Sequence, residues 1–208
     1  MGVKRPVAEG VNMKRGFSVV MVVVSLLGVS ALAQGTGPSA PASGYRAEFL
    51  RGLADTEKKF VNLAEKMPQE KYTWRPGEGV RSISEVYLHV AVANYGIPRV
   101  LGTQPPEGFN PKGFEASTTE KAKVVEALKQ SFAHMRQAAL NVSDADADKP
   151  VKMFGGETTY RGALLIITRH TAEHLGQSIA YARINGVVPP WTEEAQQRQQ
   201  QQPQKKSP

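Results

Sequence analysis

The sequence predicts an all-α fold, a four-helix bundle with long interhelical loops. Four segments of the 208-residue chain carry apolar residues at steps of three and four, the spacing of one helix face, and no segment shows a convincing strand pattern. Helices with one apolar stripe can bury it only against one another, as a bundle allows. The three connections are long and rich in Pro and Gly, so the helices need not follow a simple up-and-down order.

The first two helices have recognisable ends. We expect the first to run from about Tyr45 to Met67, because Pro68 cannot continue a helix. The second begins near Ser82, a good N-cap residue, and Glu85 three positions later completes a capping box. Pro98 kinks or ends this second helix.

The third and fourth predicted helices lie in the second half of the chain. The third is expected from Thr118 or Thr119 to about Val142, and the fourth from about Tyr160 to Ile184, followed by the favoured C-terminal pair Asn185-Gly186. Four aromatic residues of the connections are expected to cover one end of the bundle: Trp74, Phe109, Phe114 and Phe154.

The two ends of the chain read as processing and low-complexity segments. Lys14 and Arg15 precede an apolar run over 17–29 and an Ala-x-Ala ending, which predicts a signal peptide over 1–33 with cleavage after Ala33. Met13 is an alternative start, and the mature protein would be the same. Residues 34–44 form a flexible leader, 45–191 the bundle and 192–208 a disordered Gln-rich tail. We therefore expect an exported protein, periplasmic or extracellular, with no stable membrane anchor after cleavage.

The amino-acid composition restricts the classes of binding partner and the kinds of catalytic or metal-binding group that the chain can use. The formal net charge is +7, part of it within 1–33, and no basic stripe of the kind that nucleic-acid binding needs is present. The chain has no cysteine, so disulfides, thiolate ligands and a Cys nucleophile are excluded. Any metal ion must be held by His, Asp, Glu, backbone or water.

The inward face of the fourth helix turns from apolar to polar. After Ala163 and Ile167 it continues with His170, His174 and then Gln177 and Tyr181. A buried amide or imidazole without a partner costs about 1–3 kcal/mol. A bundle core would not hold several such groups unless something satisfied them.

Two histidines one turn apart can bind the same ion, and a third ligand must then come from elsewhere. His89, at the edge of the apolar stripe of the second helix, is the candidate for it. Three imidazoles with a position left open suit zinc or nickel, with iron, copper or manganese as further candidates. A single inward histidine is ordinarily a satisfied core residue, but the pair His170 and His174 favours a metal.

The roles of the other polar residues near this pattern can each be interpreted in two ways. Glu85 caps the second helix or serves as a hydrogen-bond acceptor or general base, and Glu173 and Tyr181 are equally ambiguous. Gln177 is expected to hydrogen-bond a ligand ring or a bound water. His134, on the third helix, is expected to face solvent and to stay outside the site.

With these residues in place, the chain resembles the DinB-like superfamily of metal-dependent bundles. Three segments carry the resemblance: Trp74-Arg-Pro-Gly77, the stretch from Arg81 to His89, and His170-Thr-Ala-Glu-His-Leu-Gly-Gln177 with the chain that follows it to Pro190. The resemblance implies a bundle, often dimeric, with a divalent metal on three histidines that map to His89, His170 and His174. Relatives include transferases and isomerases that use bacillithiol or mycothiol, cytoplasmic thiols that an exported chain would not meet.

The sequence supports several hypotheses about the function. We expect metal-dependent hydrolysis or group transfer on a small molecule, with Glu85 or Glu173 as the possible base. The alternatives are a non-catalytic metal-binding module and a small-molecule-binding protein without metal. His170-x-x-Glu173-His174 also matches an inverted zinc-peptidase motif, which is disfavoured because His89 already offers the third ligand. Substrate, metal identity and oligomeric state stay open.

Overall fold

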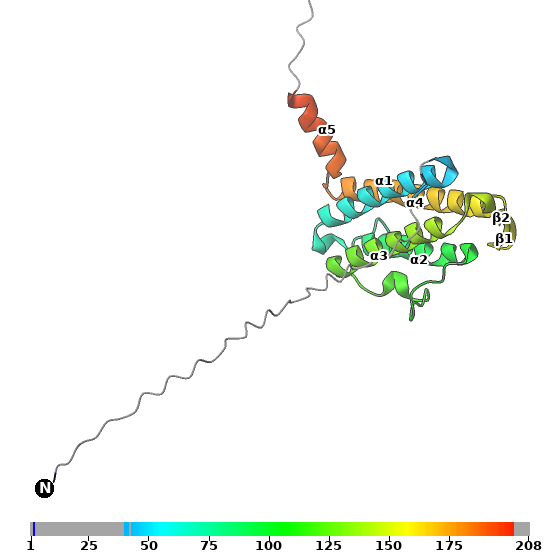
Figure 1. Cartoon of the computed structure of the whole chain (residues 1–208). Helices are drawn as coiled ribbons and strands as arrows, with labels where there is room; N and C mark the ends of the chain where they lie inside the picture. The colour runs from blue at the N-terminus through cyan, green and yellow to red at the C-terminus, as the bar shows by residue number, and fades with distance from the viewer. Residues whose placement is uncertain (1, 3–39, 42, 202–208) are drawn as a thin grey trace, which may run out of the picture. The chain divides into compact units, whose positions relative to one another are not determined.

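A computed structural model describes residues 2, 40–41 and 43–201 of the chain. Apart from residue 2, the predicted signal peptide lies outside the described residues, as does most of the predicted leader. Within them, the secondary structure is mainly helical (Figure 1). The five α-helices of the described part are α1 (Gly44–Lys66), α2 (Ile83–Gly96), α3 (Lys121–Asn141), α4 (Tyr160–Ile184) and α5 (Pro190–Gln201). No helix in this part of the chain has both the length and the apolar character needed to cross a membrane.

The four helices expected from the sequence are present, and local capping explains where they begin. Ser82 caps α2 through a complete capping box with Glu85, and the Thr159 hydroxyl caps α4 by accepting a hydrogen bond from the Gly162 amide. The start of α3 differs from the expected Thr118 or Thr119. The Thr118 hydroxyl accepts from the Glu120 amide and closes a turn before the helix, so α3 begins at Lys121.

The bundle has a crossed order rather than a sequential one. The α1 helix packs on α3 and α4, and α2 also packs on α3 and α4. Successive helices α1 and α2 are therefore diagonal partners, which the long first connection permits. The core between them is apolar and aromatic, with Phe60, Tyr87 and Phe132 among its fully buried side chains. What matters for function is that α2 and α4 are neighbours.

A two-stranded hairpin precedes α4, and its presence corrects the expectation that the chain has no strand. Strand β1 (Pro150–Met153) pairs antiparallel with β2 (Gly156–Thr159), and Met153 lies opposite Gly156. The turn residues Phe154 and Gly155 both have positive φ, 51° and 78°, as a type I′ turn requires. Strands of four residues are too short to display a clear alternation, which is why the sequence pattern does not reveal them.

The expected aromatic cover at one end of the bundle is only partly present. Phe154 is 82% exposed at the hairpin tip and does not cover the end of the bundle. Trp74 packs edge-on against Tyr181 of α4, with ring centroids 5.3 Å apart. Phe109 and Phe114 pack against each other and against Tyr95, so they anchor the α2–α3 connection.

The segment expected as a disordered tail is helical up to Gln201. Helix α5 begins with Pro190, a residue well suited to the first helical position, and continues through Gln, Glu and Arg, which are good helix formers. Glu193 on α5 pairs with Lys66 at the end of α1 at 3.1 Å. A low-complexity composition therefore did not preclude a helix here, and residues 202–208 lie outside the described part.

Candidate metal centre

Three histidines from two helices meet at one point between α2 and α4. The distance between the ring centroids is 5.0 Å for His89 and His170, and 4.6 Å for each of the other two pairs. The Nε2 atoms of His89 and His170 are 3.0 Å apart. One nitrogen from each of His89, His170 and His174 lies within 4.8 Å of the other two. The structure thus brings together the three residues that the sequence nominates.

Local helix geometry explains how this convergence arises. His170 and His174 are one turn apart, so their rings leave α4 on the same side. His89 comes from the middle of α2, the helix fixed at its start by the Ser82 capping box. All three rings are half-buried rather than enclosed in the core. The cluster can therefore be reached by solvent or by a small molecule.

Glu115 orients the ring of His89. Its Oε1 lies 2.6 Å from His89 Nδ1, and because a carboxylate can only accept, Nδ1–H donates. Nε2 of His89 is then left as the free donor atom facing His170. Arg81 holds the same carboxylate, with its Nε 2.7 Å from Glu115 Oε2. A carboxylate behind a histidine is the arrangement that commonly fixes metal-ligating imidazoles.

The charge on Glu115 is secured by these partners. Burial raises the pKa of the Glu115 carboxyl, but the hydrogen bonds from Arg81 and His89 outweigh burial and hold the pKa below its usual value. Glu115 is therefore ionised at neutral pH.

Sequence reasoning missed Glu115. It lies 26 residues from His89 in the short 3₁₀ helix η3 (Phe114–Ala116), outside any periodic pattern. It reaches the site because its neighbour Phe114 packs with Tyr95 of α2, with ring centroids 6.4 Å apart. No local signal in the sequence connects these contacts.

Gln177 orients the ring of His174, as Glu115 orients that of His89. The Gln177 Oε1 lies 2.8 Å from His174 Nδ1, and the amide nitrogen of Gln177 donates to the Tyr181 hydroxyl at 2.9 Å. In this amide orientation Gln177 Oε1 accepts from His174 Nδ1–H and leaves His174 Nε2 free. Gln177 and Tyr181 thus lie behind a histidine, in the supporting positions expected of them.

The surroundings of His170 and His174 favour neutral imidazoles. Burial, followed by the charges that His174 and His89 would carry, lowers the pKa of His170 to about 4. Burial also lowers the pKa of His174. The His170 Nδ1 atom is buried without a hydrogen-bond partner. Neutral imidazole is the form that binds metal ions, so these rings need not first lose a proton near neutral pH.

The donor set fits a divalent ion. Histidine nitrogens bind zinc at about 2.0–2.1 Å, which places two of them roughly 3.3 Å apart in a tetrahedral site. The observed spacing begins at 3.0 Å for one pair and stays within 4.8 Å for the set. Three protein ligands leave a coordination position for water or substrate. The cluster can therefore hold a metal ion, whose identity the three imidazoles do not determine.

The two candidate bases have different surroundings. Glu85 accepts from the Ser82 amide at 2.6 Å and pairs with Arg75 at 3.1 Å. The Ser82 backbone bond is the largest influence on the Glu85 pKa and holds it below its usual value despite burial. Glu173 is 61% exposed, pairs only loosely with Arg169 at 3.6 Å, and lines a cavity beside the cluster. Glu85 is thus engaged in capping, whereas Glu173 faces the accessible side.

His134 does not join the cluster, and its expected exposure is wrong. Its ring is half-buried 5.3 Å from the Tyr95 ring, and its Nε2 is buried without a partner. Burial lowers the pKa of His134. The helical-wheel angle placed it away from Phe132, but Tyr95 near the end of α2 packs against that side of α3.

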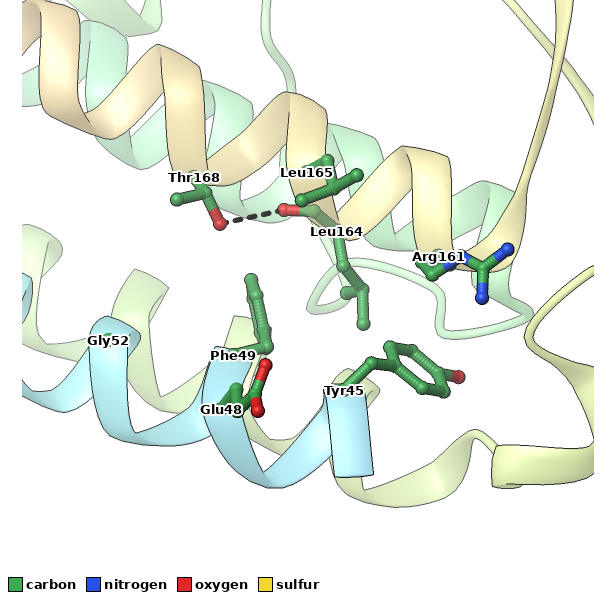
Figure 2. A pocket seen from close by; sticks show the side chains of 8 residues that line it. All are labelled: Tyr45, Glu48, Phe49, Gly52, Arg161, Leu164, Leu165 and Thr168. Atoms are coloured by element: carbon green, nitrogen blue, oxygen red, sulfur yellow. Dashed lines mark hydrogen bonds between the residues drawn. The ribbon is translucent and has the colours of Figure 1, made fainter. Parts of the chain in front are cut away.

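Two cavities flank α4 on different sides. One, of about 710 Å³, includes His89 and His170 in its lining. The other, of about 360 Å³, lies between α1 and α4, where Figure 2 shows Tyr45 and Phe49 across from Leu164. The α4 residues of the second cavity are turned roughly 140° around the helix from those of the first, at 100° per residue. Since no histidine lines it, the α1–α4 cavity is separate from the cluster.

Comparison with known proteins gives a consistent result. The family model described as the DinB superfamily matches residues 53–178, a span that includes all three histidines. A DinB-like protein from Bacillus cereus is 16% identical, with a TM-score of 0.61. A DinB-like protein from Bacillus subtilis is 20% identical, with a TM-score of 0.54. Each alignment covers 68% of this chain and 93% of the other, and identities this low establish the fold alone. No curated protein matches the chain.

Proposed function

The chain belongs to the DinB superfamily, and from this premise we propose that it is an exported protein with a divalent metal ion on His89, His170 and His174 that acts on a small molecule. The observation that carries the proposal is the convergence of three ring nitrogens within 4.8 Å beside an open cavity. We propose zinc or nickel as the ion, because nitrogen-only ligation suits both.

The chemistry proposed is hydrolysis or group transfer. A bound divalent ion supplies a Lewis acid that polarises a substrate oxygen. The chain itself orients two of its ligands through Glu115 and Gln177, which keep His89 and His174 in one tautomer. Glu173, at the cavity wall and only loosely paired, is the side chain best placed to accept a proton from a nucleophile. Glu85 keeps its capping role.

Metal content tests the first part of this proposal. The purified protein, loaded with zinc or nickel and freed of excess, should carry nearly one ion per chain. His89→Ala and His170→Ala should each lose most of it, whereas His134→Ala, a half-buried histidine outside the cluster, should not. Wild-type protein without metal after loading would leave only the binding-protein alternative.

Turnover tests the second part. The loaded protein is assayed against a panel of small esters, phosphoesters and transferable electrophiles. Glu173→Gln should lower kcat by about 10²–10⁴-fold while leaving metal content unchanged. Metal binding without turnover on any substrate, together with reduced thermal stability of the metal-free form, would support a structural ion instead.

Export is a separate part of the proposal. It is supported by the basic pair Lys14-Arg15, the apolar run over 17–29 and the Ala-x-Ala ending at Ala33. Expression of the full chain in a Gram-negative host, followed by N-terminal sequencing of the periplasmic fraction, should give a mature start at Gln34. Recovery of the uncleaved chain in the cytoplasm would contradict it.

A further inference from the structure

The cavity beside the histidine cluster has a predominantly apolar wall. Its volume of about 710 Å³ falls in the range of small-molecule sites. His89 and His170 belong to its lining, and seven of the other twelve lining residues are apolar: Val92, Ala93, Ile97, Val100, Met153, Phe154 and Ile166.

The cavity is elongated, with the histidines toward one end. Trp74, just before α2, packs on Tyr181 in the last part of α4, so the two helices run antiparallel. From His89 the lining follows α2 to its end at Gly96 and continues along the 3₁₀ helix η2 (Ile97–Leu101) to Arg99 and Val100. There it meets Lys152 and Phe154 of the hairpin. Ten residues of helix from His89 to Arg99 span roughly 15 Å. The hairpin end is therefore remote from the reacting centre.

The hairpin end carries positive charge. Arg99 and Lys152 line it, and within the described chain neither side chain makes an ion pair or a hydrogen bond. Lys152 stands opposite Glu157 in the hairpin register, yet no ion pair joins them within 4.0 Å. The third cation of the lining, Arg169, is paired with Glu173. Within the described chain, the end of the cavity away from the histidines thus holds two cations that have no ion-pair partner within 4.0 Å.

The residue at the hairpin tip is unusual for its place. Phe154 has a φ of 51°, in the left-handed region that bulky residues seldom adopt, in a turn type that favours Asn, Asp or Gly. It is also 82% exposed and belongs to the cavity lining. An exposed aromatic ring at a turn position that disfavours bulky residues is explained if a ligand packs on it.

We propose that this cavity binds an elongated apolar molecule with a terminal anionic group, and that such molecules are the substrate class of the site; this rests on the proposed function above. The anionic end pairs with Arg99 and Lys152, the apolar body lies against the wall and Phe154, and the reacting polar group reaches His89 and His170. Neutral polar molecules are disfavoured because the middle of the wall offers few hydrogen-bonding groups.

Decanoate is a suitable probe, with decyltrimethylammonium as a cation of the same chain length, both below micelle formation. Calorimetry on the zinc-loaded protein should show decanoate binding at least ~10-fold tighter than the cation, with an affinity that falls as salt rises. The double variant Arg99→Gln/Lys152→Gln should weaken decanoate about 10-fold. The matched control Arg51→Gln/Lys58→Gln removes two exposed cations of α1, outside this cavity, and should change nothing.

A second variant separates ligand contact from turn structure. Phe154→Asn places a residue favoured by the type I′ turn and should raise thermal stability while weakening decanoate several-fold. If stability rises and decanoate affinity is unchanged, the ring does not contact the ligand and the proposal is overturned.

The same measurements distinguish this proposal from the metal proposal. Decanoate could instead bind with its carboxylate on the ion. Its affinity would then be lost without zinc and would be unchanged in the Arg99→Gln/Lys152→Gln variant. That result overturns the proposed binding of the anionic group by Arg99 and Lys152 but does not affect the metal proposal. The expected result is that affinity in metal-free protein stays within about 3-fold of the loaded form. Tight decanoate binding in a protein that never takes up metal would overturn the metal proposal alone.

Discussion

Glu115 is the residue on which the geometry of His89 depends most. Its carboxylate accepts from His89 Nδ1 at 2.6 Å and is itself held by Arg81, so the His89 ring has one tautomer and one orientation. Partners of this kind typically contribute 10–100-fold to metal affinity. Their effect is exerted through the ligand, without contact to the ion.

We therefore predict that Glu115→Ala lowers metal affinity about 10–100-fold, measured by competition with a chromophoric chelator. The matched control is Glu107→Gln, an exposed carboxylate in the same α2–α3 connection. An unchanged affinity in Glu115→Ala would show that His89 is oriented by other means.

His134 carries a pH dependence that does not involve the cluster. Because burial lowers its pKa, the folded protein binds fewer protons at this ring than the unfolded chain, whose histidines titrate near about 6.5. The stabilising contribution is complete above that pH and is lost as the pH falls through the unfolded value toward the lower folded value. Acid therefore destabilises the fold through His134.

Replacing His134 by Phe should remove the loss of stability in acid. It also removes the buried Nε2 atom that has no hydrogen-bond partner beside Tyr95. We predict a gain in Tm over wild type that is larger at pH 5 than at pH 8, measured by calorimetry with metal chelated from both proteins. Equal gains at both pH values would mean that the ring titrates normally in the fold.

Local signals explain which site residues could be predicted from the sequence. His170 and His174 could be found because a helix places residues four apart on one side, and His89 because it lies beside an apolar stripe. Glu115 could not be found, since only the packing of Phe114 on Tyr95 brings its loop to α2. The exposure expected for His134 was wrong because Tyr95, near the end of the neighbouring helix α2, packs beside its ring.

At the scale of elements, α4 and α2 were predictable and the hairpin was not. Thr159 and the Asn185-Gly186 pair mark the ends of α4 where the periodicity also stops, and the capping box marks the start of α2. The β1–β2 pair is too short for a pattern, and its Phe154-Gly155 turn lacks the Asn or Asp that usually signals one. Helix α5 was hidden because a composition typical of disorder also contains good helix formers.

The capping role of Glu85 gives a prediction at this scale. Glu85→Ala should lower the free energy of unfolding by about 1 kcal/mol, because the Ser82 amide and Arg75 lose their partner at the start of α2. Metal affinity should change less than 3-fold, since His89 lies one turn further along. Denaturant unfolding and chelator competition measure the two quantities. A loss of metal affinity as large as that in Glu115→Ala would assign Glu85 to the site instead.

For the whole molecule, the cluster lies across the contact between two helices that are far apart in the chain. An ion on His89 and His170 would join α2 to α4 directly. A ligand that binds only the folded state at 100 times its Kd adds about 2.7 kcal/mol. In a domain of this size that corresponds to a Tm higher by about 5–10 °C.

We predict such a rise on zinc or nickel loading and its reversal by a chelator, followed by circular dichroism. The Tm of His170→Ala should not rise on loading, because only two of the three ligands remain, one on each helix, and they bind the ion too weakly to stabilise the fold. A Tm that does not respond to metal in wild-type protein would argue against an ion spanning the two helices.

The crossed order of the bundle is a property that sequence patterns do not specify. Four stripes predict four helices, but not that α1 and α2 are diagonal while α2 and α4 are neighbours. Long connections allow several orders, and packing decides among them. The shared centre of His89 with His170 and His174 exists only in orders that make α2 and α4 adjacent.

X-ray absorption at the metal edge of the zinc- or nickel-loaded protein tests the shared centre most directly. The predicted spectrum has three imidazole nitrogens at about 2.0–2.1 Å, with the multiple-scattering features of the rings, and any residual metal in His89→Ala should show two. A wild-type spectrum fitted by two imidazoles or fewer, or one that His89→Ala leaves unchanged, would contradict the account.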